Sequence, residues 1–269
     1  MARKVEAKED FIPSNLPHTR KEQFFDLLKN NYKELIKCGF LLLLFSLPFF
    51  VLTIIRVMLI HGAGDDGNKI IAIEILFYGT NIITSMVFSL GLAGILKIFK
   101  RLIWNEPIFY KHDLLEGIKE NAWRFLLFSF LLSLLYGLSE IVIIFTIGGP
   151  YLCYISKVLY LVFFCPFMLG AIFFSHTYKS SLGTAFKAGI IFMFKCYPST
   201  ILSCLSIEVF LLLSLIPFAF MRLGILALFI VFLMPICILG VSINQFRIFD
   251  KFVNPLNYPQ YVGKGLYKE

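Results

Sequence analysis

The residue types that most often carry out chemistry are scarce in this sequence and form no catalytic pattern. Enzymes that work inside membranes use paired Asp residues, Ser with His, or His with Glu. The four histidines lie in loops or at the ends of apolar stretches: His18, His61, His112 and His176. The six cysteines contain no C-x-x-C pair, a spacing that zinc sites commonly use. The sequence therefore predicts no enzyme activity, no cofactor and no metal site.

Six charged residues stand inside or between long apolar stretches, where an isolated charge is costly and demands a partner or a function. They are Arg56, Glu74, Glu140, Lys157, Glu208 and Arg222. Arg56 and Glu74 lie equally far from Asp65, the centre of a polar connection. Glu140 and Lys157 flank a Gly-Gly turn in the same symmetric way. Residues equally far from a hairpin turn share one depth, so we predict an ion pair in each of these two hairpins.

Glu208 has no base at the matching position of a third hairpin. Reflecting it about Arg222 leads to Ile236, which cannot form an ion pair. Glu208 follows the start of its apolar stretch by about seven residues, or roughly 10 Å at 1.5 Å per residue. It would borrow a partner from another hairpin, stay protonated, or bind a cation, a proton or a partner helix.

The composition indicates a protein whose solvent is lipid. Of the 269 residues, 58% are hydrophobic and 16% are charged, and the mean hydropathy is +0.81. Ordinary soluble domains are about half apolar and about a quarter charged. A water-soluble fold of this size could not cover so much apolar surface. The composition argues against a disordered chain, a nucleic-acid partner and a soluble enzyme, and membrane topology accounts for the formal net charge of +8.

The apolar stretches predict an all-α, polytopic membrane bundle of six transmembrane helices arranged as three hairpins. About twenty apolar residues cross a bilayer as a helix. Four spans stand apart in the sequence: 38–55, 70–96, 125–147 and 150–174. The stretch 201–243 has twice the needed length, so we expect two helices in it, joined by a tight turn at Met221 and Arg222.

Lys and Arg fall very unequally on the two sides of this arrangement. One side receives 21 of them and the other receives four. The positive-inside rule then places both termini in the cytoplasm. The predicted division is a cytoplasmic segment 1–37 with an amphipathic helix, a six-span domain 38–243, and a cytoplasmic tail 244–269. Because the outer connections are short, a soluble partner should be met from the cytoplasm.

Three segments on the basic side have the pattern of amphipathic helices that lie at the membrane surface and turn into the next span. Their apolar faces fall within 24–35, 114–125 and 182–197. Thr19 with Glu22, and Asp113 with Glu116, have the spacing of a helix-capping box. One such helix plus one hairpin would form a unit that occurs three times. The segments serve either as topological spacers or as a cytoplasmic docking surface.

Three stretches resemble the YesL-like family of bacterial integral membrane proteins. They are LLFSLPFFVL at 43–52, EPIFYKHDLLEGIKENAWR at 106–124, and FDKFVNPLNYPQYVGKGLY at 249–267. The sequence departs from the family at 36–41, where members often carry Asn and Trp. The resemblance implies a multi-pass plasma-membrane protein that accompanies carbohydrate ABC transporters. The family has no assigned activity, so the resemblance supplies no catalytic residues.

Two functions remain open from the sequence. The first is an accessory or regulatory component of solute (carbohydrate) uptake, which binds ABC-transporter subunits or a cytoplasmic regulator. The second is a small transporter or channel, which six proline-kinked spans with intramembrane charges would permit. The lipid bilayer is the one partner that both readings require. Neither the substrate nor the oligomeric state follows from the sequence.

Overall fold

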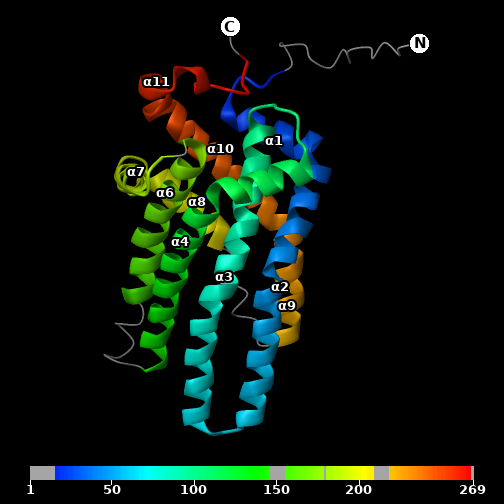
Figure 1. Ribbon diagram of the computed structural model, residues 1–269, viewed down its shortest axis with the longest axis vertical. Helices are drawn as coiled ribbons and strands as arrows, with labels where there is room; N and C mark the ends of the chain where they lie inside the picture. Colours follow the sequence, from blue (N-terminus) through cyan, green and yellow to red (C-terminus); the bar gives the residue numbers. More distant parts are fainter. Residues whose placement is uncertain (1–15, 146–154, 179, 209–217, 268–269) are drawn as a thin grey trace, which may run out of the picture.

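The computed structural model describes residues 16–145, 155–178, 180–208 and 218–267, and the regular elements within these ranges are helices. Long helices stand side by side in one bundle (Figure 1). Five are long and apolar enough to cross a membrane: α2 (Tyr32–Ala63), α3 (Gly67–Ile103), Tyr110–Val142 within α4 (Tyr110–Ile144), Ile155–Tyr178 ending in α6 (Cys165–Tyr178), and Ala219–Phe252. The prediction of an all-α, polytopic membrane bundle is confirmed.

A bent pair of helices supplies the sixth candidate span. Helices α7 (Leu182–Lys195) and α8 (Tyr197–Glu208) meet the length and hydropathy criteria only together, and they are bent by 105°. The second half of the predicted fifth span, 209–217, lies outside the described residues, and so does the Gly-Gly turn at 148–149. The described residues therefore contain five such helices, or six spans if the bent pair is counted as one, and α7 itself corresponds to the third predicted interfacial helix.

The predicted turn at Met221 and Arg222 is wrong. Helix α9 (Ala219–Leu228) begins before both residues and passes through them. It continues through a π-helical turn (Phe229–Leu233) into α10 (Met234–Phe252). The prediction rests on Arg222, the charge in the middle of the stretch, but a long basic side chain near a helix end can extend to the interface. Pro217, which precedes the helix, is the better boundary signal because proline cannot continue a preceding helix.

Pro166 interrupts its span through a π-helical turn. The ring of a proline inside a helix collides with the carbonyl group four residues earlier. Over Tyr160–Phe164 the backbone hydrogen bonds take the π-helical pattern, and the Cys165 N–H donates to the Tyr160 carbonyl group. The carbonyl group of Val162, four residues before Pro166, instead accepts a hydrogen bond from the Tyr197 hydroxyl at 3.3 Å. This hydrogen bond therefore ties the π-helical turn before α6 to the first turn of α8.

Pro235 follows the second π-helical turn in the same way, since the Met234 N–H donates to the carbonyl group of Phe229. The freed carbonyl group of Val231 faces Gly39 in α2 so closely that a Cβ atom on Gly39 would lie 2.0 Å from it. Only glycine allows this approach. Pro48, by contrast, lies inside the unbroken helix α2.

The three predicted interfacial helices have different outcomes. Helix α1 (Arg20–Asn30) begins as predicted, with the Glu22 N–H donating to the Thr19 hydroxyl at 3.2 Å. Helix α7 is also separate from the helix that follows it. The middle prediction is wrong, because α4 begins at Tyr110 and runs unbroken to Ile144, so Asp113 lies inside its first turns. Asn31 breaks the first segment and Pro198 follows the break in the third, whereas 113–144 contains no proline.

The tightly packed core lies in one half of the bundle. The buried residues of α2 all precede Pro48, and nine of the twelve buried residues of α3 fall within 91–103. Helices α3 and α4 pack antiparallel, with Gly94 against Leu114 and Gly137 against Tyr78. The outer halves of α2 and α3 form a long hairpin that extends toward the bottom of Figure 1. Lipid is the natural neighbour of this exposed apolar surface.

Candidate functional site

The segments predicted to share one side of the membrane meet at one end of the bundle, at the top of Figure 1. We call this region the polar end and define it as residues 16–30, 97–124, 175–197 and 247–267. Gln23 joins three of these segments, because its amide donates to the carbonyl groups of Ile103, at 2.7 Å, and Gly265, at 3.1 Å. Lys100 donates to the carbonyl group of Thr177 at 3.1 Å and so joins the fourth.

An ion pair between the first helix and the last long helix holds the polar end together. The Arg20 guanidinium donates to one carboxylate oxygen of Asp250 at 2.7 and 3.1 Å. Both side chains are shielded from solvent, with 7% and 17% of their surfaces exposed. The other oxygen of Asp250 accepts from the Asn254 amide at 2.8 Å and from the Gly263 N–H at 3.2 Å. We call Arg20, Gln23, Asp250 and Asn254 the tail latch.

The latch fixes the tail through short helices and stacked rings. Helix α11 (Asn254–Asn257) and a 3₁₀ turn (Pro259–Tyr261) follow α10. The Tyr178 hydroxyl at the end of α6 donates to Asn254 at 2.5 Å, and the Tyr178 ring stacks on Tyr258 at 4.5 Å between centroids. Lys264 binds Glu106 at 2.6 Å and lies 4.0 Å from the centre of the Trp104 ring. The tail is thus bound to both connections that flank it.

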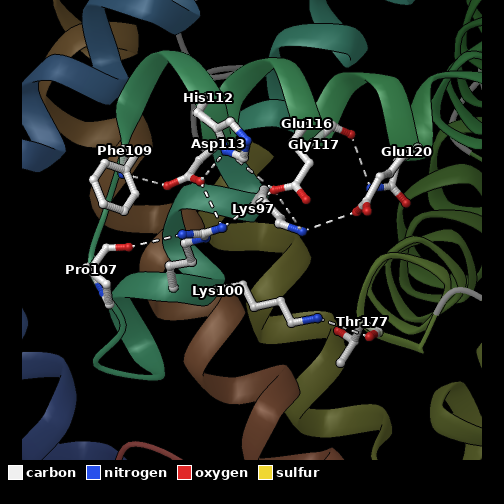
Figure 2. A network of polar contacts seen from close by, with 12 residues as sticks. Lys97, Lys100, Pro107, Phe109, His112, Asp113, Glu116, Gly117, Glu120 and Thr177 are labelled. Atoms are coloured by element: carbon white, nitrogen blue, oxygen red, sulfur yellow. Dashed lines mark hydrogen bonds and ion pairs between the residues drawn. The ribbon is translucent and has the colours of Figure 1, made fainter.

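A second polar network joins the end of α3 to the beginning of α4 (Figure 2). Lys97 lies between two carboxylates of α4, at 3.5 Å from Glu116 and 3.2 Å from Glu120. Arg101, one turn later, contacts Asp113 at 3.1 Å and Glu116 at 3.5 Å. Asp113 is fully buried and also accepts from the N–H of Phe109 at 2.7 Å. The carboxylate therefore fixes both the start of α4 and its contact with α3.

The same network contains a group of side chains with metal-ligand chemistry. One ligand atom each from His112, Asp113 and Glu116 lies within 4.8 Å of the others. Both carboxylates already bind Arg101, so a guanidinium occupies the position that a cation would take. His112 is largely exposed. We therefore assign the group to the α3–α4 contact.

A pocket of about 260 Å³ lies between the α1–α2 junction and the α3–α4 connection. Its walls include Asn31, Glu34, Asn105, Glu106 and Tyr110. Glu34 is bound to Lys37, and Glu106 is bound to Lys264. Small-molecule sites usually enclose about 300–1,000 Å³. The pocket is therefore small, and its two carboxylates are already neutralised.

The first predicted intramembrane ion pair is present. The Arg56 guanidinium donates to one oxygen of Glu74 at 2.5 and 3.1 Å. Arg56 also lies over the ring of Phe77, 4.6 Å from its centroid. The second oxygen of Glu74 is buried and has no hydrogen-bond partner within the described ranges. The pair joins α2 to α3 in the outer half of the first hairpin, as the symmetry of the sequence predicts.

The second predicted ion pair is present as well, with Lys157 at 3.2 Å from Glu140. Tyr78 and Tyr136 also lie near enough to Glu140 to interact with it electrostatically. Tyr78 belongs to the first hairpin, so Glu140 lies where the two hairpins meet. Lys157 is about half exposed, whereas Glu140 is largely shielded.

The remaining two intramembrane charges have less definite surroundings. Glu208 is the last residue of α8, and its side chain lies outside the described residues. Arg222 lies in the first turns of α9, half-buried. The structure brings together four of the six predicted charges, as two pairs, and leaves the predicted role of Glu208 without a structural description.

Reasoning from the sequence missed the tail latch. Its members come from positions 20, 23, 250 and 254, and no spacing rule connects them. The α3–α4 network had a readable signal, because Lys97 and Arg101 are four residues apart, and Asp113, Glu116 and Glu120 follow at helical spacing. Opposite charges at matched spacing on two antiparallel helices predict such a contact.

Comparisons with known proteins found no match: no family model, no curated protein and no solved structure resembles the chain significantly.

Proposed function

We propose that this multi-pass membrane protein is an accessory or regulatory component of carbohydrate uptake, which binds ABC-transporter subunits through its polar end. The partner class comes from the resemblance of three stretches to the YesL-like family. Two of those stretches, 106–124 and 249–267, fall within the polar end. The polar end supports a docking role because it is one rigid surface made from the first, middle and last segments of the chain.

The observation that carries this proposal is the exposure of Leu256 on the latched tail. Leu256 belongs to α11, at the extreme top of Figure 1, and 84% of its surface is exposed. The helix that presents it is fixed through Asn254, which is buried and bound to Asp250 and Tyr178. A partner that covers a side chain on an already fixed helix has little backbone left to order, which lowers the entropic cost of binding.

Co-purification tests this docking surface. A tagged copy is expressed in the native host, and transporter subunits retained with it are identified by mass spectrometry. Leu256→Ser should lower their recovery by roughly tenfold, as for an interface anchor worth about 1.4 kcal/mol. Leu59→Ser is the matched control, because Leu59 is also exposed but lies near the end of α2 that is remote from the polar end. Equal recovery from both variants, or no transporter subunits with wild type, would contradict the proposal.

We propose that the polar end faces the cytoplasm of a bacterial plasma membrane. The support is the bias of 21 to four in Lys and Arg between the two sides. Single cysteines at Asp65 and Lys111, in a background without other reactive thiols, are labelled in intact cells with an impermeant maleimide. Both positions are exposed. Asp65→Cys should react and Lys111→Cys should not; the opposite pattern would reverse the orientation.

The alternative of a small transporter or channel has weaker support from the contacts. Four of the six intramembrane charges are paired within or between adjacent helices. Charges that neutralise each other in this way are typical of structural ion pairs. Uptake of labelled sugar by liposomes that contain this protein alone would favour the alternative.

A further inference from the structure

Helix α7 lies across the bundle. Figure 1 shows it end-on, so its axis runs perpendicular to the long axis of the molecule, and the bend into α8 is 105°. The Ser181 hydroxyl caps its start by accepting from the Thr184 N–H at 3.3 Å. Gly189 packs against Gly170 of α6 so closely that a Cβ atom on Gly189 would meet the Phe167 carbonyl oxygen at 2.6 Å. The helix is therefore held in this orientation by backbone contact.

The exposed face of α7 carries three large apolar side chains, beside Thr184 and Lys187. Ile190, Ile191 and Phe194 are exposed, and Phe194 has 74% of its surface exposed. The buried face carries Ala185, Ala188 and Phe192 instead. A helix that lies across a membrane bundle at its polar end, with large apolar side chains facing outward, is placed to enter the boundary between headgroups and acyl chains.

Three cations gather where α7 meets α8. Lys195 ends α7, while Arg247 and Lys251 lie one turn apart on α10. The ammonium groups of Lys195 and Lys251 lie 5.6 and 5.1 Å from the centroid of the Phe252 ring, so they are at most 10.7 Å apart. Both lysines and Arg247 act electrostatically on Cys196 at the α7–α8 corner.

These three cations are exposed and form no ion pair with any carboxylate in the described part of the chain. Asp250, their neighbour in sequence, is bound to Arg20 on one oxygen and to Asn254 and Gly263 on the other. Lys97 and Arg101, by contrast, each contact carboxylates of α4. An unpaired cluster of three positive charges favours an anionic ligand.

We propose that the α7–α8 corner binds an anionic phospholipid, with its phosphate against Lys195, Arg247 and Lys251 and its acyl chains against Ile190, Ile191 and Phe194. A free phosphate ester offers the same charged group, but it has no acyl chains to contact the apolar side chains beside the cations. A phospholipid supplies both a phosphate for the three cations and acyl chains for the three apolar side chains. This inference goes beyond the docking role and does not depend on it, because neither Leu256 nor the transporter takes part.

Lipid binding to the purified full-length protein tests the site. The protein is reconstituted in nanodiscs of phosphatidylcholine with increasing phosphatidylglycerol, and bound lipid is counted by native mass spectrometry. Lys251→Gln with Arg247→Gln should weaken phosphatidylglycerol binding on the order of thirtyfold, at about 1 kcal/mol per basic residue. Lys21→Gln with Lys29→Gln is the matched control, because both lysines are exposed on α1 and the net charge changes equally.

A second variant distinguishes lipid from free phosphate. Phe194→Ser should weaken phosphatidylglycerol binding without changing the binding of glycerol phosphate, because the phenyl ring would contact acyl chains alone. The elution profile of each variant shows that it is folded. Equal binding of phosphatidylcholine and phosphatidylglycerol, or equal losses in the test and control pairs, would overturn the proposal. Displacement of the lipid by millimolar glycerol phosphate would assign the site to a soluble phosphate ester instead.

Discussion

The polar end and the outer half of the first hairpin both bury charged side chains, but they pair them across very different distances in sequence. Arg20 and Asp250 are 230 residues apart, whereas Arg56 and Glu74 are 18 residues apart. The hairpin pair can form as soon as α2 and α3 meet. The tail latch can form only when the first and last segments have both reached the polar end. The tail latch therefore forms only after the rest of the chain has folded.

The two ion pairs also differ in how many other groups they bind. Arg20 additionally donates to the Gln23 amide oxygen at 2.7 Å and to the Lys264 carbonyl group at 3.1 Å. Arg56 has one further contact, with the face of the Phe77 ring. An ion pair whose members also make directional hydrogen bonds loses those bonds when the acid and the base are exchanged. An ion pair with few other partners should tolerate the exchange. This difference can be tested directly.

The largest effect is expected from breaking the tail latch. Arg20→Ala leaves the Asp250 carboxylate shielded and without its cation, so the free energy of unfolding should fall by about 3–5 kcal/mol. Denaturation of the purified protein in detergent measures the loss. The exchange Arg20→Asp with Asp250→Arg should not restore stability, because Asn254 and the Gly263 N–H would then face a guanidinium. Full rescue by that exchange would show that the latch is a simple charge pair.

Two glycines with positive φ show how the closely packed polar end differs from the open tip of the first hairpin. Gly265 has φ +85°, and a Cβ atom on it would lie 2.0 Å from the Ile103 carbonyl oxygen. Gly64 has φ +57° and no atom within 4 Å of a Cβ atom. Gly64→Ala should cost about 1–3 kcal/mol from backbone strain alone. Gly265→Ala should cost about 1–3 kcal/mol more, because the chain must also move away from Ile103.

Thermal unfolding of the two glycine variants under one set of conditions checks this difference. A larger loss from Gly64→Ala than from Gly265→Ala would mean that the tail is not held against the α3–α4 connection as described. Limited proteolysis gives a second readout, since Gly265→Ala should speed cleavage within 258–267 and Gly64→Ala should not.

Exchange of charges in the first hairpin should have a smaller and reversible effect. Arg56→Glu places two carboxylates side by side and should lower stability by about 3 kcal/mol, the lower end of the range for a broken buried pair. Adding Glu74→Arg restores opposite charges at the same depth and should recover most of that loss. Denaturation of the single and double variants in the same detergent measures the coupling. Failure of the second change to recover stability would show that Arg56 and Glu74 act independently.

The features that the sequence predicted correctly are local ones. Hydrophobic length identified the spans, and symmetry about a turn identified both intramembrane ion pairs, because each depends on residues within one hairpin. The Thr19 cap of α1 is local in the same sense. The wrong turn at Met221 and Arg222 came from treating a charge as a boundary when the preceding Pro217 was the stronger signal.

The polar end could not be predicted in the same way. Gln23 reaches Ile103 and Gly265 only because three separate segments fold onto one another, and nothing periodic in the sequence marks those positions. The close approach of Gly39 to Val231 depends likewise on a carbonyl group freed by Pro235, which is about 200 residues away in the chain. Such contacts depend on tertiary packing and require the structure.

The smallest expected effect concerns the cap at the tip of the first hairpin. Asp66 precedes α3, accepts a hydrogen bond from the Lys69 N–H at 3.2 Å and pairs with the Lys69 ammonium group at 3.1 Å. The side-chain interaction with Lys69 is the main reason that the pKa of Asp66 lies below its usual value of 3.8. The contribution of Asp66 to stability is therefore present above that value and disappears as the pH falls through the lowered pKa.

Carbon NMR of the Asp66 carboxyl group measures this shift. Its titration midpoint should lie below 3.8 in the wild-type protein and return toward that value in Lys69→Ala, which removes the cation while keeping the backbone N–H. Because the group is fully exposed, salt should reduce the effect, in contrast to the shielded Arg20–Asp250 pair. A midpoint that Lys69→Ala leaves unchanged would assign the shift to the start of α3 alone, where the helix dipole favours a negative charge.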